Sequence, residues 1–137
     1  MSDQNALAEA ARAAGLAPSV HNTQPWRWRV HGDHLDLYAD RSRQLTAADP
    51  EGRLLLISCG AALHHARIAL AAAGWRPAVE RFPDAGEPDH LARVRLSERV
   101  GVSPEAIRRF QLTQVRRTDR RPLVDAPVDP AVLDQVR

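Results

Sequence analysis

The sequence predicts an α+β fold, and three observations lead to it. Residues 26–30 and 35–39 alternate apolar and polar side chains with the period of a half-buried β-strand. Residues 54–73 form a run that is apolar on most faces, which is typical of a helix buried in a domain or an interface. The length of 137 residues, with 44% hydrophobic and 26% charged side chains, fits one modest globular domain.

The first elements are a helix, a loop and a hairpin. An alanine-rich run predicts a helix over residues 5–14 that ends at Gly15. Residues 17–26 contain two prolines and several small polar residues, which exclude a regular helix and predict an ordered loop. The two alternating stretches follow, and the turn at residues 32–33 predicts that they pair as a β-hairpin.

The long helix has a clear start signal at Asp49, Pro50 and Glu51. Asp49 is a helix-capping residue, Pro50 suits a first helical position, and Glu51 faces the positive end of the helix dipole. We therefore expect this helix to begin there and to run to Gly74.

The rest of the chain predicts two strands and two helices. The strands are expected at about residues 78–82 and 90–97, and a short helix is expected from Ser103 to about Phe110. Residues 129–130 open another helix, whose apolar face has no later segment of this chain to pack against.

Charge and cysteine content exclude several classes of protein. All 19 basic residues are arginines and the net charge is +2, which is too small to predict a nucleic-acid partner. A single cysteine, Cys59, excludes an internal disulfide framework and a cysteine-based zinc cluster. Residues 1–5 lack the basic start of a signal peptide, and the uncharged stretch 54–66 is too short for a membrane span. We therefore expect a cytoplasmic protein without a membrane partner.

The loop at residues 17–26 is the first candidate site. Its prolines fix the backbone, and Ser19, Asn22 and Gln24 offer short donors and acceptors that can point in one direction. Such a loop suits a planar ligand with polar edges. The alternative is a connection whose polar groups satisfy only their own backbone, and the residues alone leave both interpretations open.

The arginine-rich segment at residues 116–121 is the second candidate site. Guanidinium groups pair with phosphate oxygens, and Thr118 can donate a hydroxyl hydrogen bond to the same group. The alternative is a solvated basic loop. A nucleic-acid contact is not supported, because the segment carries no interleaved aromatic side chains.

The histidines and the cysteine predict no metal site and no catalytic residue. His31 and His34 flank a hairpin turn, where we expect solvent-facing side chains rather than ligands. His64 and His65 are adjacent in a helix and diverge by about 100°. Cys59 lies in the apolar helix and is expected to be a small buried hydrophobe.

Two segments together resemble the nitroreductase family of flavin enzymes. Residues 17–26 match that family's A-P-S-x-x-N-x-Q-P-W signature at every fixed position, and residues 116–120 are similar to its R-R-[ST]-x-R phosphate-binding motif. Residues 36–45 and 56–63 resemble the Acg-like branch, in which two nitroreductase-like halves are fused in one chain.

The resemblance implies a nitroreductase-like fold that is incomplete in this chain. In such a fold a mixed sheet is flanked by helices, and a long central helix is buried. Residues 1–112 would form the first half and residues 113–137 the beginning of a second, truncated half. The apolar central helix would then offer a surface for a homo-oligomer.

The resemblance also implies an FMN site, formed where the loop of the first half meets the arginine motif of the second. The arginines would hold the phosphate and the ribityl chain, and the loop would lie against the isoalloxazine. The expected cofactor-binding residues are Ser19, Asn22, Gln24, Arg116, Arg117, Thr118 and Arg120.

The implied activity is hydride transfer from NAD(P)H through the flavin to a nitroaromatic or quinone-type acceptor. Because the cofactor carries this chemistry, no protein acid or base is required. Two alternatives stay open: a protein that sequesters FMN without turning over nicotinamide, and an inert fragment or interaction module.

Overall fold

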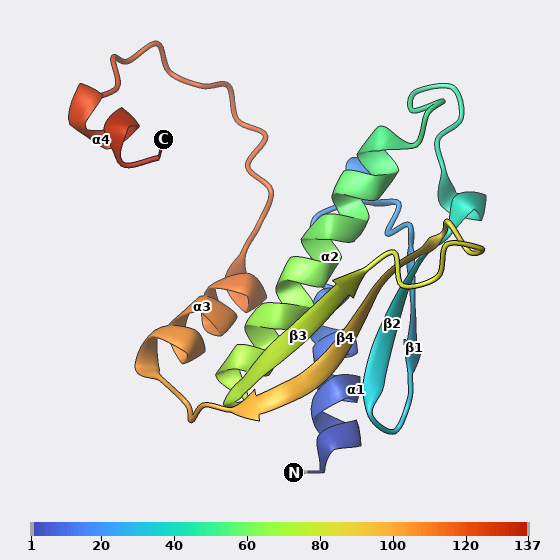
Figure 1. The fold of residues 1–137 in the computed structure, drawn as a ribbon. Helices are drawn as coiled ribbons and strands as arrows, with labels where there is room; N and C mark the ends of the chain where they lie inside the picture. Colours follow the sequence, from blue (N-terminus) through green and yellow to red (C-terminus); the bar gives the residue numbers. More distant parts are fainter. Residues whose placement is uncertain (1, 137) are drawn as a thin grey trace.

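The computed structural model describes residues 2–136 and shows helices packed on one face of a four-stranded sheet (Figure 1). The strands are β1 (Trp26–Val30), β2 (His34–Ala39), β3 (Trp75–Arg81) and β4 (His90–Arg99), in the order β1-β2-β4-β3. The expected α+β class is confirmed. The expectation of a mixed sheet is wrong for the described residues. Strand β4 lies between β2 and the edge strand β3, and it runs antiparallel to both.

Strand β2 is more deeply buried than its alternating sequence predicts. Leu35 and Leu37 face the helices and are 0% and 1% exposed. Asp36 and Tyr38 point to the opposite face, yet they are also buried. The reason is that β2 lies inside the sheet, where polar side chains of the neighbouring strands cover its second face; the guanidinium of Arg29, for example, lies 4.7 Å from the centre of the Tyr38 ring.

Helix α1 (Asp3–Ala14) is close to its predicted position, whereas α2 (Arg53–Ala72) begins four residues after Asp49. Asp49 still caps α2, because its buried carboxylate accepts hydrogen bonds from the backbone N–H groups of Leu54 and Leu55 at 3.1 and 2.9 Å. A left-handed Gly52, with φ +73°, turns the chain between the cap and the helix.

One side of α2 forms the centre of the core and the other side is open. Buried side chains such as Leu55 and Leu70 pack toward α1 and the sheet, whereas Leu54 and Ile57 are 43% and 68% exposed. The expectation of an all-round buried helix is therefore correct for one side only. By length and composition alone the 20-residue α2 could cross a membrane, with a mean hydropathy of 1.5, although the uncharged stretch within it is shorter.

The C-terminal part of the chain leaves the sheet. Helix α3 (Pro104–Val115) packs against α2 and ends five residues later than predicted, and the hydroxyl of its N-cap residue Ser103 accepts the N–H of Ala106. An extended segment then leads to α4 (Pro130–Asp134), which lies apart from the sheet (Figure 1). The predicted division at residues 112/113 falls inside α3 and stays a prediction.

Candidate functional site

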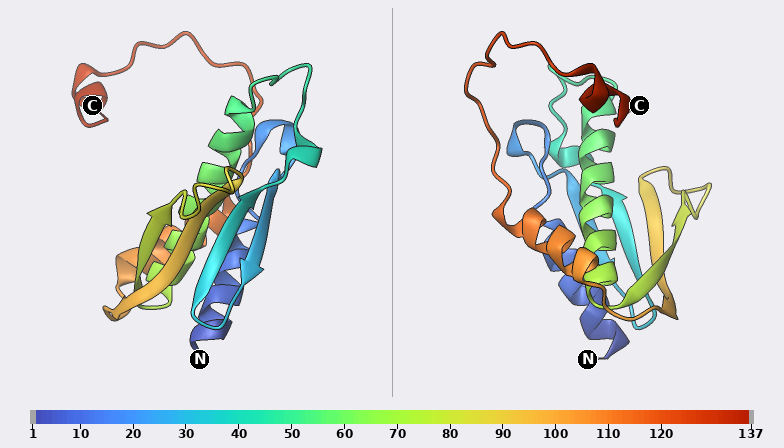
Figure 2. Two further views of the ribbon diagram at one scale, coloured as in Figure 1. Left: turned by 45° about the vertical axis from the view of Figure 1, so that its right-hand side comes forward. Right: turned by 90° about the vertical axis from the view of Figure 1, so that its left-hand side faces the viewer.

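The predicted loop and the predicted arginine motif line one cavity of about 710 Å³. The loop follows α1, and the segment after α3 rises along the same side of α2 (Figure 2). All seven residues predicted to bind the cofactor contribute to its lining: Ser19, Asn22, Gln24, Arg116, Arg117, Thr118 and Arg120. Segments that are about a hundred residues apart in sequence are thus brought together by the packing of α1 and α3 on α2.

The loop wall of the cavity has an unusual backbone. A short 3₁₀ turn covers Val20–Asn22, and three non-glycine residues have left-handed φ angles: His21 at +46°, Asn22 at +55° and Gln24 at +48°. This region is costly for side chains with a Cβ atom, so the surrounding contacts must hold it. Such strain is concentrated at functional sites, where it aims side chains that a relaxed loop would turn elsewhere.

Helix α2 holds the loop through two buried side chains. The Ser58 hydroxyl accepts the N–H of Val20 at 3.0 Å and donates to the carbonyl of Leu54 at 2.7 Å. The Cys59 thiol donates to the carbonyl of Pro25 at 3.3 Å, and burial raises the pKa of this thiol to about 12. The prediction that Cys59 is a small buried residue is confirmed, and its thiol additionally fixes the end of the loop.

Hydrogen bonds within the loop fix the polar groups that face the cavity. The Ser19 hydroxyl accepts the N–H of Gln24 at 2.9 Å, so its own hydrogen stays available for donation. The side-chain amide of Gln24 donates weakly to the Asn22 carbonyl oxygen at 3.4 Å. Arg43 spans the loop from outside and donates to the backbone carbonyls of Thr23 and Gln24.

The opposite wall carries unneutralised positive charge. Among residues 2–136, no carboxylate lies within ion-pair distance of Arg116, Arg117 or Arg120. The acidic residue of the motif, Asp119, pairs instead with Arg121, whose guanidinium donates to both carboxylate oxygens at 2.7–3.2 Å. The hydrogen bonds from Arg121 lower the pKa of Asp119, so this carboxylate is committed to Arg121 rather than to the arginines of the cavity.

The cavity also contains residues that the sequence did not single out as ligands. His21, Thr113 and Gln114 contribute to its lining. His21 lies inside the loop signature, but Thr113 and Gln114 reach the cavity only because α3 continues past Phe110. Thr113 and Gln114 lie three and two residues before Arg116, and this proximity to the arginine motif indicates a place in the site only when the end of the helix is known.

His65 lies next to this site. The two adjacent histidines of α2 diverge as expected, with His64 exposed and His65 buried. Burial, and then the charges of His64 and Arg116, lower the pKa of His65, so a neutral imidazole lies beside the arginine wall. Within the part of the chain that the structure describes, its Nδ1 has no hydrogen-bond partner.

Comparison with known proteins identifies relatives of this chain. No family model matches it. Two proteins of Mycobacterium tuberculosis (strain ATCC 25618 / H37Rv) are each named "Putative NAD(P)H nitroreductase", one Rv3131 and the other acg. Rv3131 is 47% identical over 105 residues, which cover 77% of this chain and 30% of that protein. The acg protein is 41% identical over 131 residues, which cover 96% of this chain and 40% of that protein.

The chain is a homologue of proteins named as nitroreductases. A third relative from the same organism, "Uncharacterized protein Rv3127", is 42% identical over 139 residues, covering 95% of this chain and 40% of that protein. These identities support the nitroreductase family for this chain. The chain spans 30–40% of the length of the curated relatives it matches.

Proposed function

We propose that the cavity binds FMN and that the chain belongs to a nitroreductase-type oxidoreductase. The proposed reaction is hydride transfer from NAD(P)H through the flavin to a nitroaromatic or quinone-type acceptor. One observation carries the proposal: three guanidinium groups that have no acidic partner among residues 2–136 and a rigid loop of short polar side chains line the same cavity.

The residues present fit FMN in size and in chemistry. A cavity of about 710 Å³ lies within the range of about 300–1,000 Å³ that is usual for small-molecule sites. Its charge is uneven, because the arginines come from the segment after α3 and the neutral amides and hydroxyl come from the loop after α1. A ligand with a phosphate dianion at one end and a planar heterocycle with polar edges at the other matches this division.

At the arginine wall, Arg116, Arg117 and Arg120 would hold the phosphate. Guanidinium groups bind phosphate oxygens with directed pairs of N–H donors, and the nearby Thr118 hydroxyl adds a further donor. Because Asp119 is paired with Arg121, it does not compete for these arginines. The bound phosphate would therefore replace water around exposed cations and would not have to break an ion pair within residues 2–136.

At the loop wall, Ser19 and Asn22 would lie against the ring system, with Gln24 nearby. The hydrogen bonds to Ser58 and from Arg43 hold this wall in place before the ligand arrives, which lowers the ordering cost of binding. FMN, when bound, supplies the hydride and electron transfer chemistry. The chain's own residues would bind it, orient it and place positive charge at its phosphate.

The arginine wall is tested by FMN titration of the purified chain, followed by flavin fluorescence. Replacing Arg116 and Arg117 together with alanine removes two charge-assisted contacts of about 1.5 kcal/mol each, so the affinity should fall roughly 100-fold. Arg108→Ala is the matched control, because Arg108 is an exposed arginine of α3 that carries the same charge and does not line the cavity. An affinity that survives the double substitution contradicts the phosphate assignment.

The oxidoreductase activity is tested separately, with the flavin-loaded chain and NADH or NADPH in the presence of a quinone or nitroaromatic acceptor. Oxidation of the nicotinamide that depends on bound FMN is the expected result. Tight FMN binding without nicotinamide oxidation would instead support an FMN-sequestering role for this chain.

A further inference from the structure

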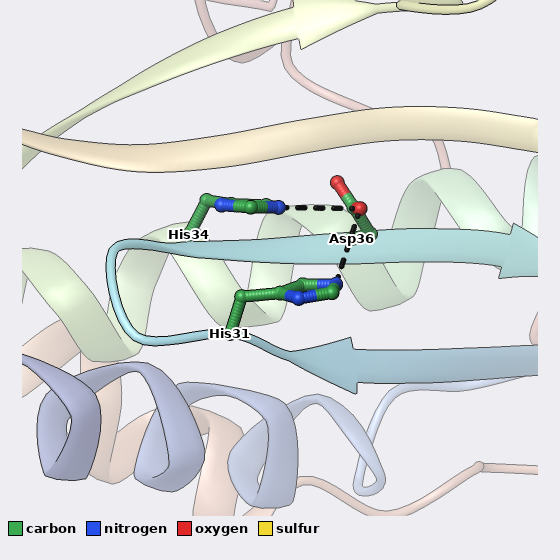
Figure 3. A group of neighbouring side chains, drawn as sticks. All are labelled: His31, His34 and Asp36. Atoms are coloured by element: carbon green, nitrogen blue, oxygen red, sulfur yellow. Dashed lines mark ion pairs between the residues drawn. The ribbon is translucent and has the colours of Figure 1, made fainter.

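A second cluster of polar side chains lies at the closed end of the β1–β2 hairpin, and none of its residues lines the proposed flavin cavity. The rings of His31 and His34 both direct a nitrogen atom toward one carboxylate oxygen of Asp36 (Figure 3). Asp36 Oδ2 lies 3.5 Å from the Nε2 atoms of both His31 and His34. The expectation that both histidines are solvent-facing turn residues is wrong for His34, whose side chain is only 16% exposed.

The spacing of these atoms fits coordination better than hydrogen bonding. A distance of 3.5 Å is long for a good N–H···O hydrogen bond, yet both imidazoles keep this same distance from one carboxylate oxygen. A tetrahedral ion with bonds of about 2.0–2.1 Å keeps its ligand atoms about 3.3 Å apart. All three potential ligand atoms lie within 4.8 Å of one another.

The neighbours of the cluster supply the support that metal ligands require. His34 Nδ1 lies 2.6 Å from the Asp33 carboxylate, and donation to it leaves the Nε2 lone pair of a neutral imidazole directed at Asp36. A carboxylate behind a ligating histidine is the common arrangement at zinc sites, where it fixes the tautomer and orients the ring.

Asp36 is fixed in position by an arginine of the neighbouring strand. Arg93, its register partner on β4, donates to Oδ1 at 2.8 Å and to Oδ2 at 2.9 Å. His90 Nε2 lies 3.1 Å from the same Oδ1 atom. Since a carboxylate oxygen can accept two interactions, Oδ2 keeps one lone pair on the side of the histidines.

From this geometry we propose that His31 Nε2, His34 Nε2 and Asp36 Oδ2 bind one divalent ion of the Zn²⁺ class, with water in the remaining position. Two nitrogens and one oxygen are donors that Zn²⁺ accepts. The two imidazole rings stack with centroids 4.2 Å apart and an angle of 14°, so binding must turn one ring toward the ion. His31 can turn, because its side chain is 44% exposed at the end of β1. The charge of Arg93 opposes the ion and makes the site weaker than one with a free carboxylate.

The test is calorimetric titration of the untagged full chain with Zn²⁺, accompanied by the visible absorption of the Co²⁺ form. One ion per chain and the intense Co²⁺ bands of four-coordinate geometry are expected. Single His31→Gln and His34→Gln variants should each weaken binding at least about tenfold, and Asp33→Asn should weaken it about 10–100-fold through His34. His64→Gln is the matched control, because His64 is an exposed histidine of α2 outside the cluster.

Circular dichroism of each variant shows whether it is folded, and His31, on the exposed turn, is the substitution with the smallest structural cost. The proposal is overturned if Zn²⁺ gives no binding heat, if the folded His31→Gln chain binds as tightly as the unmodified chain, or if His64→Gln loses as much affinity as the cluster variants.

Discussion

Substitution of Ser58 by alanine tests the mechanism that holds the loop of the proposed flavin site. The Ser58 hydroxyl is buried and connects the loop to α2 by accepting the N–H of Val20 at 3.0 Å and donating to the carbonyl of Leu54 at 2.7 Å. Alanine keeps the Cβ atom and removes only this hydroxyl. The Val20 N–H then loses its partner in a partly buried position.

A partly buried donor without a partner lowers the unfolding free energy by about 1.5 kcal/mol, a value in the lower part of the range for buried groups. For a domain of this length, that cost lowers the melting temperature by about 5 °C. Thermal unfolding followed by circular dichroism measures it, and the FMN affinity of Ser58→Ala should fall because the strained loop is less well ordered before binding. Ser97→Ala is the matched control, because the Ser97 hydroxyl also donates to a backbone carbonyl, that of Arg76, but at an exposed position. Equal melting temperatures for the two variants would refute the proposed anchoring.

Three further predictions follow from burial and charge. Cys59, with a pKa raised by burial to about 12, should not react with thiol reagents at about pH 8 in the folded chain and should react after urea unfolding. The pKa of Asp36 is about 2 in the folded chain, compared with an ordinary value of 3.8. Its ionised form should therefore stabilise the fold fully above about pH 4, and the unfolding free energy should decrease by about 2 kcal/mol as the pH falls toward 2. Urea titrations across this range should show no such decrease for a folded Asp36→Asn variant. Leu70→Ala, at a fully buried position of α2, should lower the unfolding free energy by about 2–5 kcal/mol, whereas Ile57→Ala, at a position 68% exposed, should change it by less than about 0.5 kcal/mol; a comparable loss in both would contradict the packing of α2.

Much of the fold could be predicted because local signals and packing agree. The alternation at residues 26–30 and 35–39, with a tight turn between them, leads directly to the observed hairpin. The start of α2 could not be predicted as well, since Asp49 caps the helix from a distance through two N–H groups. The antiparallel arrangement of β4 depends on long-range pairing with β2, which no local pattern records.

The residues that line the candidate site could be predicted from the sequence, but the contacts that hold its loop in place could not. Ser19, Asn22 and the arginines are recognisable from their motifs, but the role of Ser58 depends on the turn of α2 that meets the loop. The hairpin cluster shows the same limit. The sequence pattern places Asp36 on the polar side of a half-buried strand. Asp36 is buried and accepts a hydrogen bond from Arg93 only because β2 lies inside the sheet.

The most direct test of the central claim is the visible spectrum of the purified chain after incubation with FMN and exhaustive dialysis. The chain should retain the flavin absorption band, and the Arg116→Ala/Arg117→Ala variant should lose it under the same dialysis while Arg108→Ala keeps it. A colourless, correctly folded chain would contradict the claim that the loop and the arginine motif of these 137 residues form a flavin site by themselves.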